Sequence, residues 1–246
     1  MTPERVTGVS GGALAAASFL SGNEERLLDE MCRAFEDQDS NLDPFAKNQH
    51  GITPHQEIYC EVVARVLDPA SVAKVADGPA FQILIAHPPR RLPPKMSGAM
   101  MAAAYEAELK LVNSPHFDWA EKMGLEYNLV DARQAARDGT LVALVCAAAV
   151  IPPVFEPPLW DGRPTVDGGM ADQAPMPEPD EGDTLILLTR RYAKVPRVEG
   201  RTYVAPSDET EADKIDFTDP AKLRATWKQG QADARRWLDE GLPDEI

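Results

Sequence analysis

The chain has few cysteines and lacks a long apolar run. Its apolar stretch at residues 141–151 ends at Pro152-Pro153 and is too short to cross a bilayer. An odd number of widely spaced cysteines gives neither a disulfide framework nor a metal-ligand pattern, and it suits a reducing compartment. These cysteines are Cys32, Cys60 and Cys146. We therefore expect a cytoplasmic protein with no transmembrane segment and no bound metal.

Basic residues are also scarce relative to acidic ones. The 25 Lys and Arg against 40 Asp and Glu give a formal net charge of −15. That balance argues against a nucleic-acid partner and against long-range attraction to an anionic membrane, and it leaves open brief lipid contact through a local apolar surface. With 246 residues, 43% of them hydrophobic, the chain is long enough for one large core. Because no internal repeat or low-complexity linker is visible, we predict a single domain over residues 1–246.

A serine pattern stands near the start of the chain, at Gly8-Val9-Ser10-Gly11-Gly12. It fits G-x-S-x-G, with a candidate strand before it and an alanine-rich candidate helix after it. A serine on such a turn exposes its hydroxyl above helical N–H groups, and flanking glycines allow the turn without a Cβ clash. The pattern predicts Ser10 as an acyl-transfer nucleophile, with Gly8, Gly11 and Gly12 forming the elbow and the Gly11 N–H as an oxyanion donor. An ordinary Gly/Ser turn is the alternative.

The nucleophile needs a base, and Asp167-Gly168-Gly169 is the candidate. Asp-Gly is also a common turn dipeptide, so a plain turn is the alternative interpretation. Every histidine precedes Asp167, which excludes the usual Ser–Asp–His chain order with this aspartate. A triad with an earlier acid stays open, whereas a Ser10–Asp167 pair with the carboxylate as direct base is simpler. The histidines are His50, His55, His87 and His116.

Together these motifs resemble the patatin-like phospholipases, which use a Ser–Asp dyad. Residues 147–155, where small residues are followed by Ile-Pro and Phe, resemble the segment that precedes the family's Asp-Gly-Gly. Residues Asp172-Gln173-Ala174-Pro175 resemble the family's Asn-x-Pro, with Gln173 at the Asn position. The resemblance covers nearly the whole chain from residue 5 onward.

The resemblance implies an α/β fold, a three-layer sandwich whose mostly parallel central sheet is flanked by helices. It implies a lipid acyl hydrolase that cleaves carboxylic esters of phospholipids or other lipids through Ser10 and Asp167, without a cofactor. We further expect the N–H groups of Gly168 and Gly169 to support the carboxylate, and the substrate to be a lipid or a small ester. Two alternatives stay open: a catalytically impaired patatin-like protein that binds lipid or a protein partner, and an unrelated α/β-hydrolase that uses a histidine.

One part of the family pattern is absent from the printed sequence. Patatin-like enzymes carry a Gly-Gly-Gly-x-Arg-Gly-type loop ahead of the serine, and its N–H groups form the oxyanion hole. Here only nine residues precede Ser10, and the chain contains no Gly-Gly-Gly. We therefore expect the first strand and its loop to be missing because the start codon was placed too late; a truly shortened chain is the alternative.

Hydrophobic periodicity and turn residues predict the remaining elements. Helices are expected over residues 11–20, 24–37, 53–67, 97–112, 140–149 and 220–238, and strands over 5–9, 81–86, 184–189 and 201–205. The continuous apolar strand at 184–189 is typical of a parallel sheet that is covered on both faces. The closing helix should bury Leu223, Trp227 and Trp237, and the acidic stretches at 178–183 and 207–213 should form a solvated face.

Overall fold

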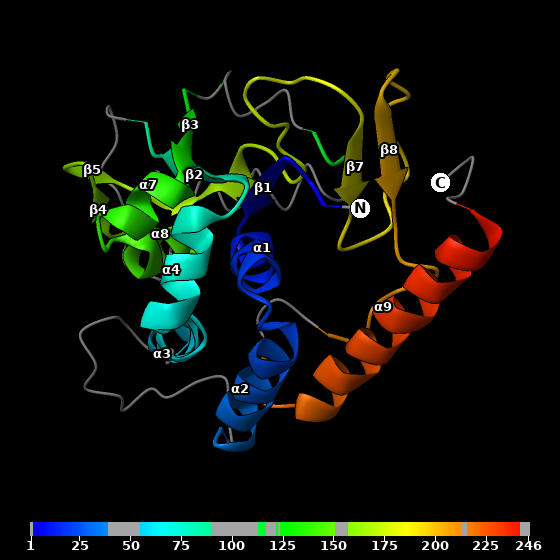
Figure 1. The fold of residues 1–246 in the computed structure, drawn as a ribbon, viewed down its shortest axis with the longest axis horizontal. Helices are drawn as coiled ribbons and strands as arrows, with labels where there is room; N and C mark the ends of the chain where they lie inside the picture. Colours follow the sequence, from blue (N-terminus) through cyan, green and yellow to red (C-terminus); the bar gives the residue numbers. More distant parts are fainter. Residues whose placement is uncertain are drawn as a thin grey trace.

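Strand β2 (Ala80–His87) is the centre of the fold in the computed structural model, which describes residues 2–38, 55–89, 113–116, 122, 124–150, 157–212 and 216–241 (Figure 1). The elements before β2 are β1 (Arg5–Val9), α1 (Gly11–Ser21), α2 (Glu24–Glu36), α3 (His55–Val66) and α4 (Pro69–Asp77). After it come β3 (Glu126–Asp131), α7 (Ala132–Arg137), α8 (Leu141–Ala147), β4 (Leu159–Trp160), β5 (Arg163–Pro164) and β6 (Val166–Asp167). The last elements are the 3-10 helix η1 (Gly168–Met170), β7 (Thr184–Leu187), β8 (Arg201–Val204) and α9 (Pro220–Glu240).

Two strands follow one another along one edge of β2. Strand β1 pairs with it in parallel as far as Val9↔Leu84, and β6 pairs antiparallel with the next residues, where Asp167 lies opposite Ile85. Strand β3 runs antiparallel along residues 82–87 and therefore occupies the other edge. The ends of β1 and β6 thus meet beside Leu84 and Ile85, which brings Ser10 and Asp167 together although 157 residues separate them in sequence.

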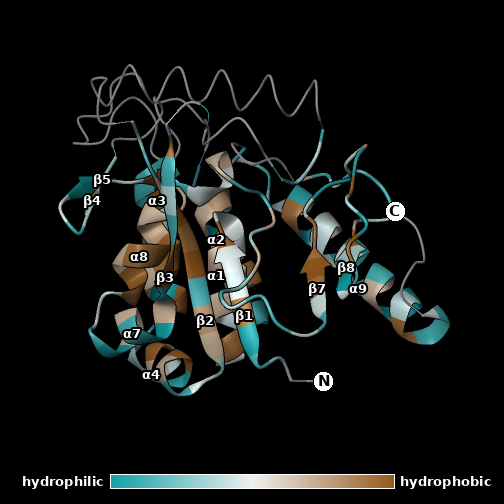
Figure 2. Cartoon of the chain, turned by 90° about the horizontal axis from the view of Figure 1, so that it is seen from above, coloured by the Kyte–Doolittle hydropathy of each residue, from teal (hydrophilic) through white to brown (hydrophobic). Residues whose placement is uncertain are grey.

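The helices cover the face of β2 that carries Phe81, Ile83 and Ile85. These three buried side chains share one apolar cluster with residues of α1, α3, α4, α7 and α8, and Figure 2 shows these helices on one side of the sheet. Because side chains alternate along a strand, Ala86 points to the opposite face. There it packs with Met170 of η1 and with Leu125, Val166 and Ala171. The helical layer therefore fixes β2, and β2 in turn fixes the segment that follows β6.

Strands β7 and β8 form a separate two-stranded parallel sheet. Ile186 and Tyr203 pack into an apolar cluster on one face. Leu185 and Leu187 point the other way and are 53% and 68% exposed, and Figure 2 colours this strand as strongly hydrophobic. The prediction of a strand covered on both faces is therefore wrong within the described residues, because only the Ile186 face has a packing layer.

The α/β class is confirmed, but the sheets are mixed rather than mostly parallel. The β1–β2 and β7–β8 pairs are parallel, whereas the β2–β3, β2–β6 and β4–β5 pairs are antiparallel. The difference arises because the chain returns to β2 twice with reversed direction, through β3 and β6. A third layer and a further strand beyond β1 stay predictions; among the described strands, β1 pairs with β2 alone.

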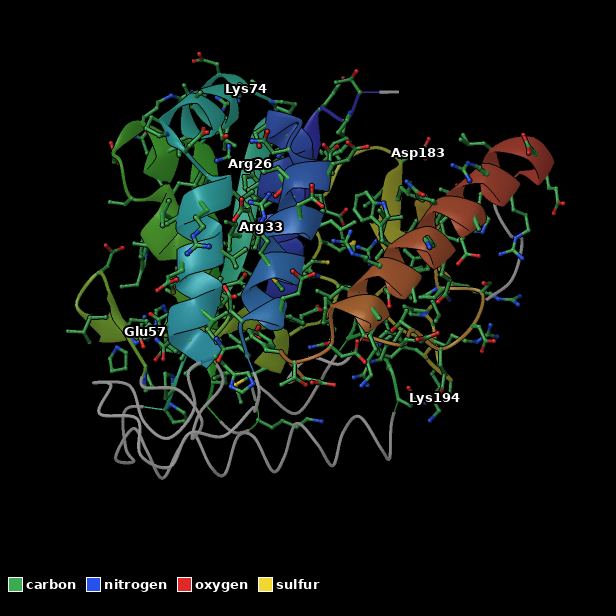
Figure 3. All side chains as sticks on the ribbon, turned by 90° about the horizontal axis from the view of Figure 1, so that it is seen from below. Arg26, Arg33, Glu57, Lys74, Asp183 and Lys194 are labelled. Carbon is green, nitrogen blue, oxygen red and sulfur yellow. The ribbon has the colours of Figure 1, made fainter. Side chains whose placement is uncertain are left out.

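Most elements lie where the sequence predicts them. The helix expected at 140–149 spans Leu141–Ala147, whereas the helix expected at 97–112 and the start of the one at 53–67 lie outside the described residues. The pattern missed α4, β3 and α7, and it also missed the short elements β4, β5, β6 and η1. Helix α9 packs against α2 (Figure 1), which leaves its expected core residues Leu223, Trp227 and Trp237 only partly buried. The acidic stretch 178–183 is exposed as predicted, and Figure 3 labels its Asp183.

Asp68 caps the start of α4. Its Oδ1 accepts the Ser71 N–H at 2.9 Å and the Ser71 hydroxyl at 2.7 Å, and its Oδ2 accepts from Arg26 of α2 at 2.6 Å. The hydrogen bond from Arg26, followed by those from Ser71, holds the pKa of Asp68 well below its ordinary value. The charged carboxylate therefore ties α4 to α2 at the end of α1 that lies away from Ser10.

We expect Asp68→Ala to lower Tm by roughly 2–4 °C, and Asp68→Asn by less, because asparagine also caps helices. Since the pKa of Asp68 is lowered in the folded chain, its contribution is present above about pH 3.9 and is lost as the pH falls through the folded value. The Tm gap between the parent and Asp68→Ala should therefore narrow in acid, as calorimetry can measure. A gap that stays constant from neutral to strongly acid pH contradicts this assignment.

Candidate active site

Ser10 occupies the turn between β1 and α1. Its φ of 54° and ψ of −133° fall in a region that side chains rarely adopt, at a cost of about 1–3 kcal/mol. It is the N-cap residue of α1, yet its side chain caps no helical N–H. Its Oγ instead donates to Asp167 Oδ2 at 2.5 Å. Ser10 thus has a strained backbone, and its hydroxyl hydrogen-bonds a carboxylate instead of capping the helix.

The three elbow glycines play different parts. A Cβ on Gly8 would lie 2.8 Å from Ala13 Cα and 2.9 Å from Gly12 O, so glycine is needed for β1 to approach the first turn of α1. A Cβ on Gly11 or Gly12 would meet nothing within 4 Å. Of the three elbow glycines, therefore, only Gly8 avoids a Cβ clash. The positive φ of the turn falls on Ser10 and not on a neighbouring glycine. Gly11 lies in the first turn of α1, where N–H groups lack intrahelical acceptors.

Asp167 ends β6 and is almost fully buried, with 4% of its surface exposed. Its N–H donates to Val150 O at 2.8 Å, which together with the pairing to Ile85 fixes its main chain. Its Oδ1 accepts the Gly169 N–H at 2.7 Å, and its Oδ2 accepts the Ser10 hydroxyl. The two carboxylate oxygens are thus divided between one bond that orients the side chain and one that reaches the serine.

Gly168 and Gly169 support this carboxylate in different ways. A Cβ on Gly168 would lie 2.3 Å from Leu84 O and 2.6 Å from Leu84 C, so glycine allows η1 to rest directly on the backbone of β2. Gly169 supplies the N–H that binds Asp167 Oδ1. The N–H support expected from both glycines is therefore seen from Gly169, whereas the contribution of Gly168 is close packing.

The described histidines have other contacts. The ring nitrogens of His87 lie 3.1 Å from Pro164 O and 3.0 Å from Asn128 Oδ1, and those of His116 lie beside Asp172 and Tyr203. His55 packs against the ring of Phe217, and His50 lies outside the described residues. The hydroxyl of Ser10 therefore meets a carboxylate, and this arrangement can pass the serine proton directly to Asp167.

Two features beside Asp167 were not predicted from the sequence, although Asp172 itself stands in the motif that resembles the family's Asn-x-Pro. Tyr59 on α3 has a buried hydroxyl with no hydrogen-bond partner among the described residues, and burial, with charge from Cys146 and Asp167, raises its pKa well above the ordinary value. Asp172, five residues after Asp167, binds His116. A single tyrosine on an amphipathic helix and an isolated histidine carry no spacing pattern, so only the folded chain reveals their location.

Within the described ranges, no three His, Cys, Asp or Glu side chains gather as metal ligands. All three cysteines are free thiols. No helix among the described residues combines the length and apolar character that a membrane span needs.

The fold and the site together define an α/β protein in which a serine elbow faces a buried aspartate. A scan against protein-family models matches residues 1–180 to the patatin-like phospholipases. Because this match covers more than half of the chain, the chain belongs to the patatin-like phospholipase family, a family of lipid acyl hydrolases. Searches of the curated proteins and of the solved structures find no match.

Proposed function

We propose that the chain hydrolyses carboxylic esters of lipids, with Ser10 as the nucleophile and Asp167 as the base. The observation that carries the proposal is the 2.5 Å hydrogen bond from Ser10 Oγ to Asp167 Oδ2, on a turn whose positive φ directs the serine away from its own helix. Membership in a family of lipid acyl hydrolases supports a lipid ester as the substrate.

The reaction runs in two halves. Ser10 Oγ attacks the ester carbonyl carbon while its proton moves to Asp167 Oδ2, and the Gly11 N–H donates to the oxyanion that forms. Collapse of the tetrahedral intermediate breaks the ester C–O bond, and the departing alcohol takes the proton from Asp167. Water then attacks the acyl-serine, passing a proton to Asp167, and the second collapse releases the acid and returns that proton to Ser10.

A carboxylate is a weak base, since an ordinary aspartate has a pKa of about 3.9. Proton transfer in this pair therefore relies on geometry and on exclusion of water. Asp167 is 4% exposed, and its second oxygen is held by the Gly169 N–H, so the oxygen that faces Ser10 has little freedom to turn away. This preorganisation favours transfer at the short contact over exchange with solvent.

A fluorophosphonate probe tests the proposal directly. The parent should be labelled on Ser10, as peptide mass spectrometry can map, and Ser10→Ala should lose the label because no other activated hydroxyl is expected. Ser18→Ala is the matched control, since Ser18 lies on the same helix and its buried hydroxyl bonds Leu14 O at 2.8 Å. Equal labelling of Ser10→Ala and the parent, or a folded parent that binds acyl lipid without hydrolysing it, would overturn the proposal.

A further inference from the structure

Three side chains from separate segments form a line beside the turn that carries Asp167. Asp172 follows η1, His116 lies in the segment 113–116, and Tyr203 is buried on β8. His116 Nδ1 lies 2.9 Å from Asp172 Oδ2 and 3.0 Å from Oδ1, and its Nε2 lies 2.8 Å from the Tyr203 hydroxyl. The rings of His116 and Tyr203 meet edge to face at 82°. Both ring nitrogens of His116 are therefore engaged.

The partners decide which nitrogen of His116 carries a proton. Because a carboxylate oxygen accepts, Nδ1 is the nitrogen that donates to Asp172, and in a neutral imidazole Nε2 then accepts from the Tyr203 hydroxyl. Burial raises the pKa of Tyr203, which keeps this hydroxyl protonated, while Arg201 hydrogen-bonds the same group and pairs with Asp180. Because neither nitrogen is free, His116 is unsuited to act as a base for Ser10.

Asp172 and its neighbour connect this line to the catalytic turn through the main chain. His116 and Asp172 form an antiparallel β-bridge, in which the Gln173 N–H donates to Pro115 O at 2.9 Å. The Asp172 N–H donates to Gly168 O at 3.1 Å, and Gln173 Nε2 donates to Gly169 O at 2.7 Å. Gly168 O and the Gly169 N–H belong to the same peptide group, and this N–H binds Asp167 Oδ1. Holding Asp172 in place therefore holds the peptide that orients the carboxylate.

We propose that His116 is a positioning residue for Asp167: by binding Asp172 it keeps the Gly169 N–H aimed at Asp167 Oδ1. This inference rests on the proposed Ser10–Asp167 mechanism. The bond to Asp172 does the positioning, and the Tyr203 hydroxyl holds the imidazole in the tautomer that makes this bond. We call the bond between His116 and Asp172 the tether. A misplacement of about 1 Å at a catalytic group can cost roughly 10²-fold in rate, so loss of the tether lowers kcat rather than substrate affinity.

Amide side chains separate the two bonds of His116, because the amide nitrogen of Asn takes the place of Nδ1 and that of Gln takes the place of Nε2. We expect His116→Asn to keep kcat within about threefold of the parent, and His116→Gln to lose about tenfold or more with KM unchanged. Tyr203→Phe should lose less than His116→Gln. Counting kcat per fluorophosphonate-titrated site removes the effect of partial unfolding, and Asp68→Ala, which weakens a distant helix cap, should keep the parent's kcat per site.

A second measurement does not depend on turnover. Amide hydrogen exchange over residues 167–174 should become faster in His116→Gln and stay near the parent rate in His116→Asn, with β2 unchanged in both. If the parent hydrolyses no ester but amide exchange in this segment is still faster in His116→Gln, the proposed Ser10–Asp167 mechanism is wrong and the tether between His116 and Asp172 is supported. Unchanged exchange in His116→Gln, or equal kcat losses in His116→Asn and His116→Gln, overturns the tether.

Discussion

Replacing Asp167 with Asn should lower kcat for ester hydrolysis by about 10³–10⁴-fold while leaving the fold intact. The carboxamide has nearly the same shape and can still accept the Ser10 hydroxyl hydrogen bond, but it cannot take up the serine proton. General-base catalysis alone is worth roughly 10²–10⁴, and members of one catalytic unit act together. Hydrolysis of a short-chain chromogenic ester, with circular dichroism on the same sample, measures the loss.

Two sets of controls sharpen this test. Asp161→Asn makes the same chemical change on the exposed turn between β4 and β5, and it should leave kcat unchanged. Single replacements of His50, His55, His87 and His116 should each cost far less than Asp167→Asn, and His116 should show the largest loss of the four because of its tether to Asp172. A single histidine replacement that matches the Asp167→Asn loss would show that the base is an imidazole.

The two side chains of the proposed dyad could be singled out from the sequence because each stands in a short motif with its own chemistry. Ser10 follows a short candidate strand and precedes an alanine-rich helix, and Asp167 stands before two glycines. Their meeting was not predictable from periodicity, because β6 is two residues long and carries no repeat. Only the pairing of β1 and β6 with successive residues of β2 shows why the two motifs face each other.

Other features could not be read from sequence because they depend on distant partners. The apolar run at β7 has the composition of a strand buried on both faces, yet Leu185 and Leu187 are exposed because β7 joins a small separate sheet. The contact between His116 and Tyr203 joins residues that lie 87 positions apart. Gly11 and Gly168 look alike in sequence, yet one has open space where a Cβ would point and the other touches the backbone of β2.

That last contrast gives the second large expected effect: Gly168→Ala should destabilise the chain and remove most of its activity. The new Cβ would lie 2.3 Å from Leu84 O and 2.6 Å from Leu84 C. These are backbone atoms of the central strand, which the helices cover on one face and β3 holds along the other edge, so they have little room to yield. Relief must come from moving β6 and η1 away from β2, and this movement separates Asp167 from Ser10.

Overpacking of this kind costs typically about 1–3 kcal/mol and sometimes more, which corresponds to a Tm loss of roughly 2–12 °C in a chain of this size. We expect kcat per titrated site to fall by about 10²-fold or more, since a shift of about 1 Å in the base suffices for that. Gly169→Ala should be milder, because its Cβ would meet the movable end of the Gln173 side chain at 2.7 Å and Asp167 Oδ1 at 3.0 Å. Gly230→Ala, in the interior of α9 with nothing within 4 Å, should be neutral or slightly stabilising. A Gly168→Ala protein with the parent's Tm and kcat would show that η1 does not rest on Leu84, and the placement of Asp167 beside β2 would have to be abandoned with it.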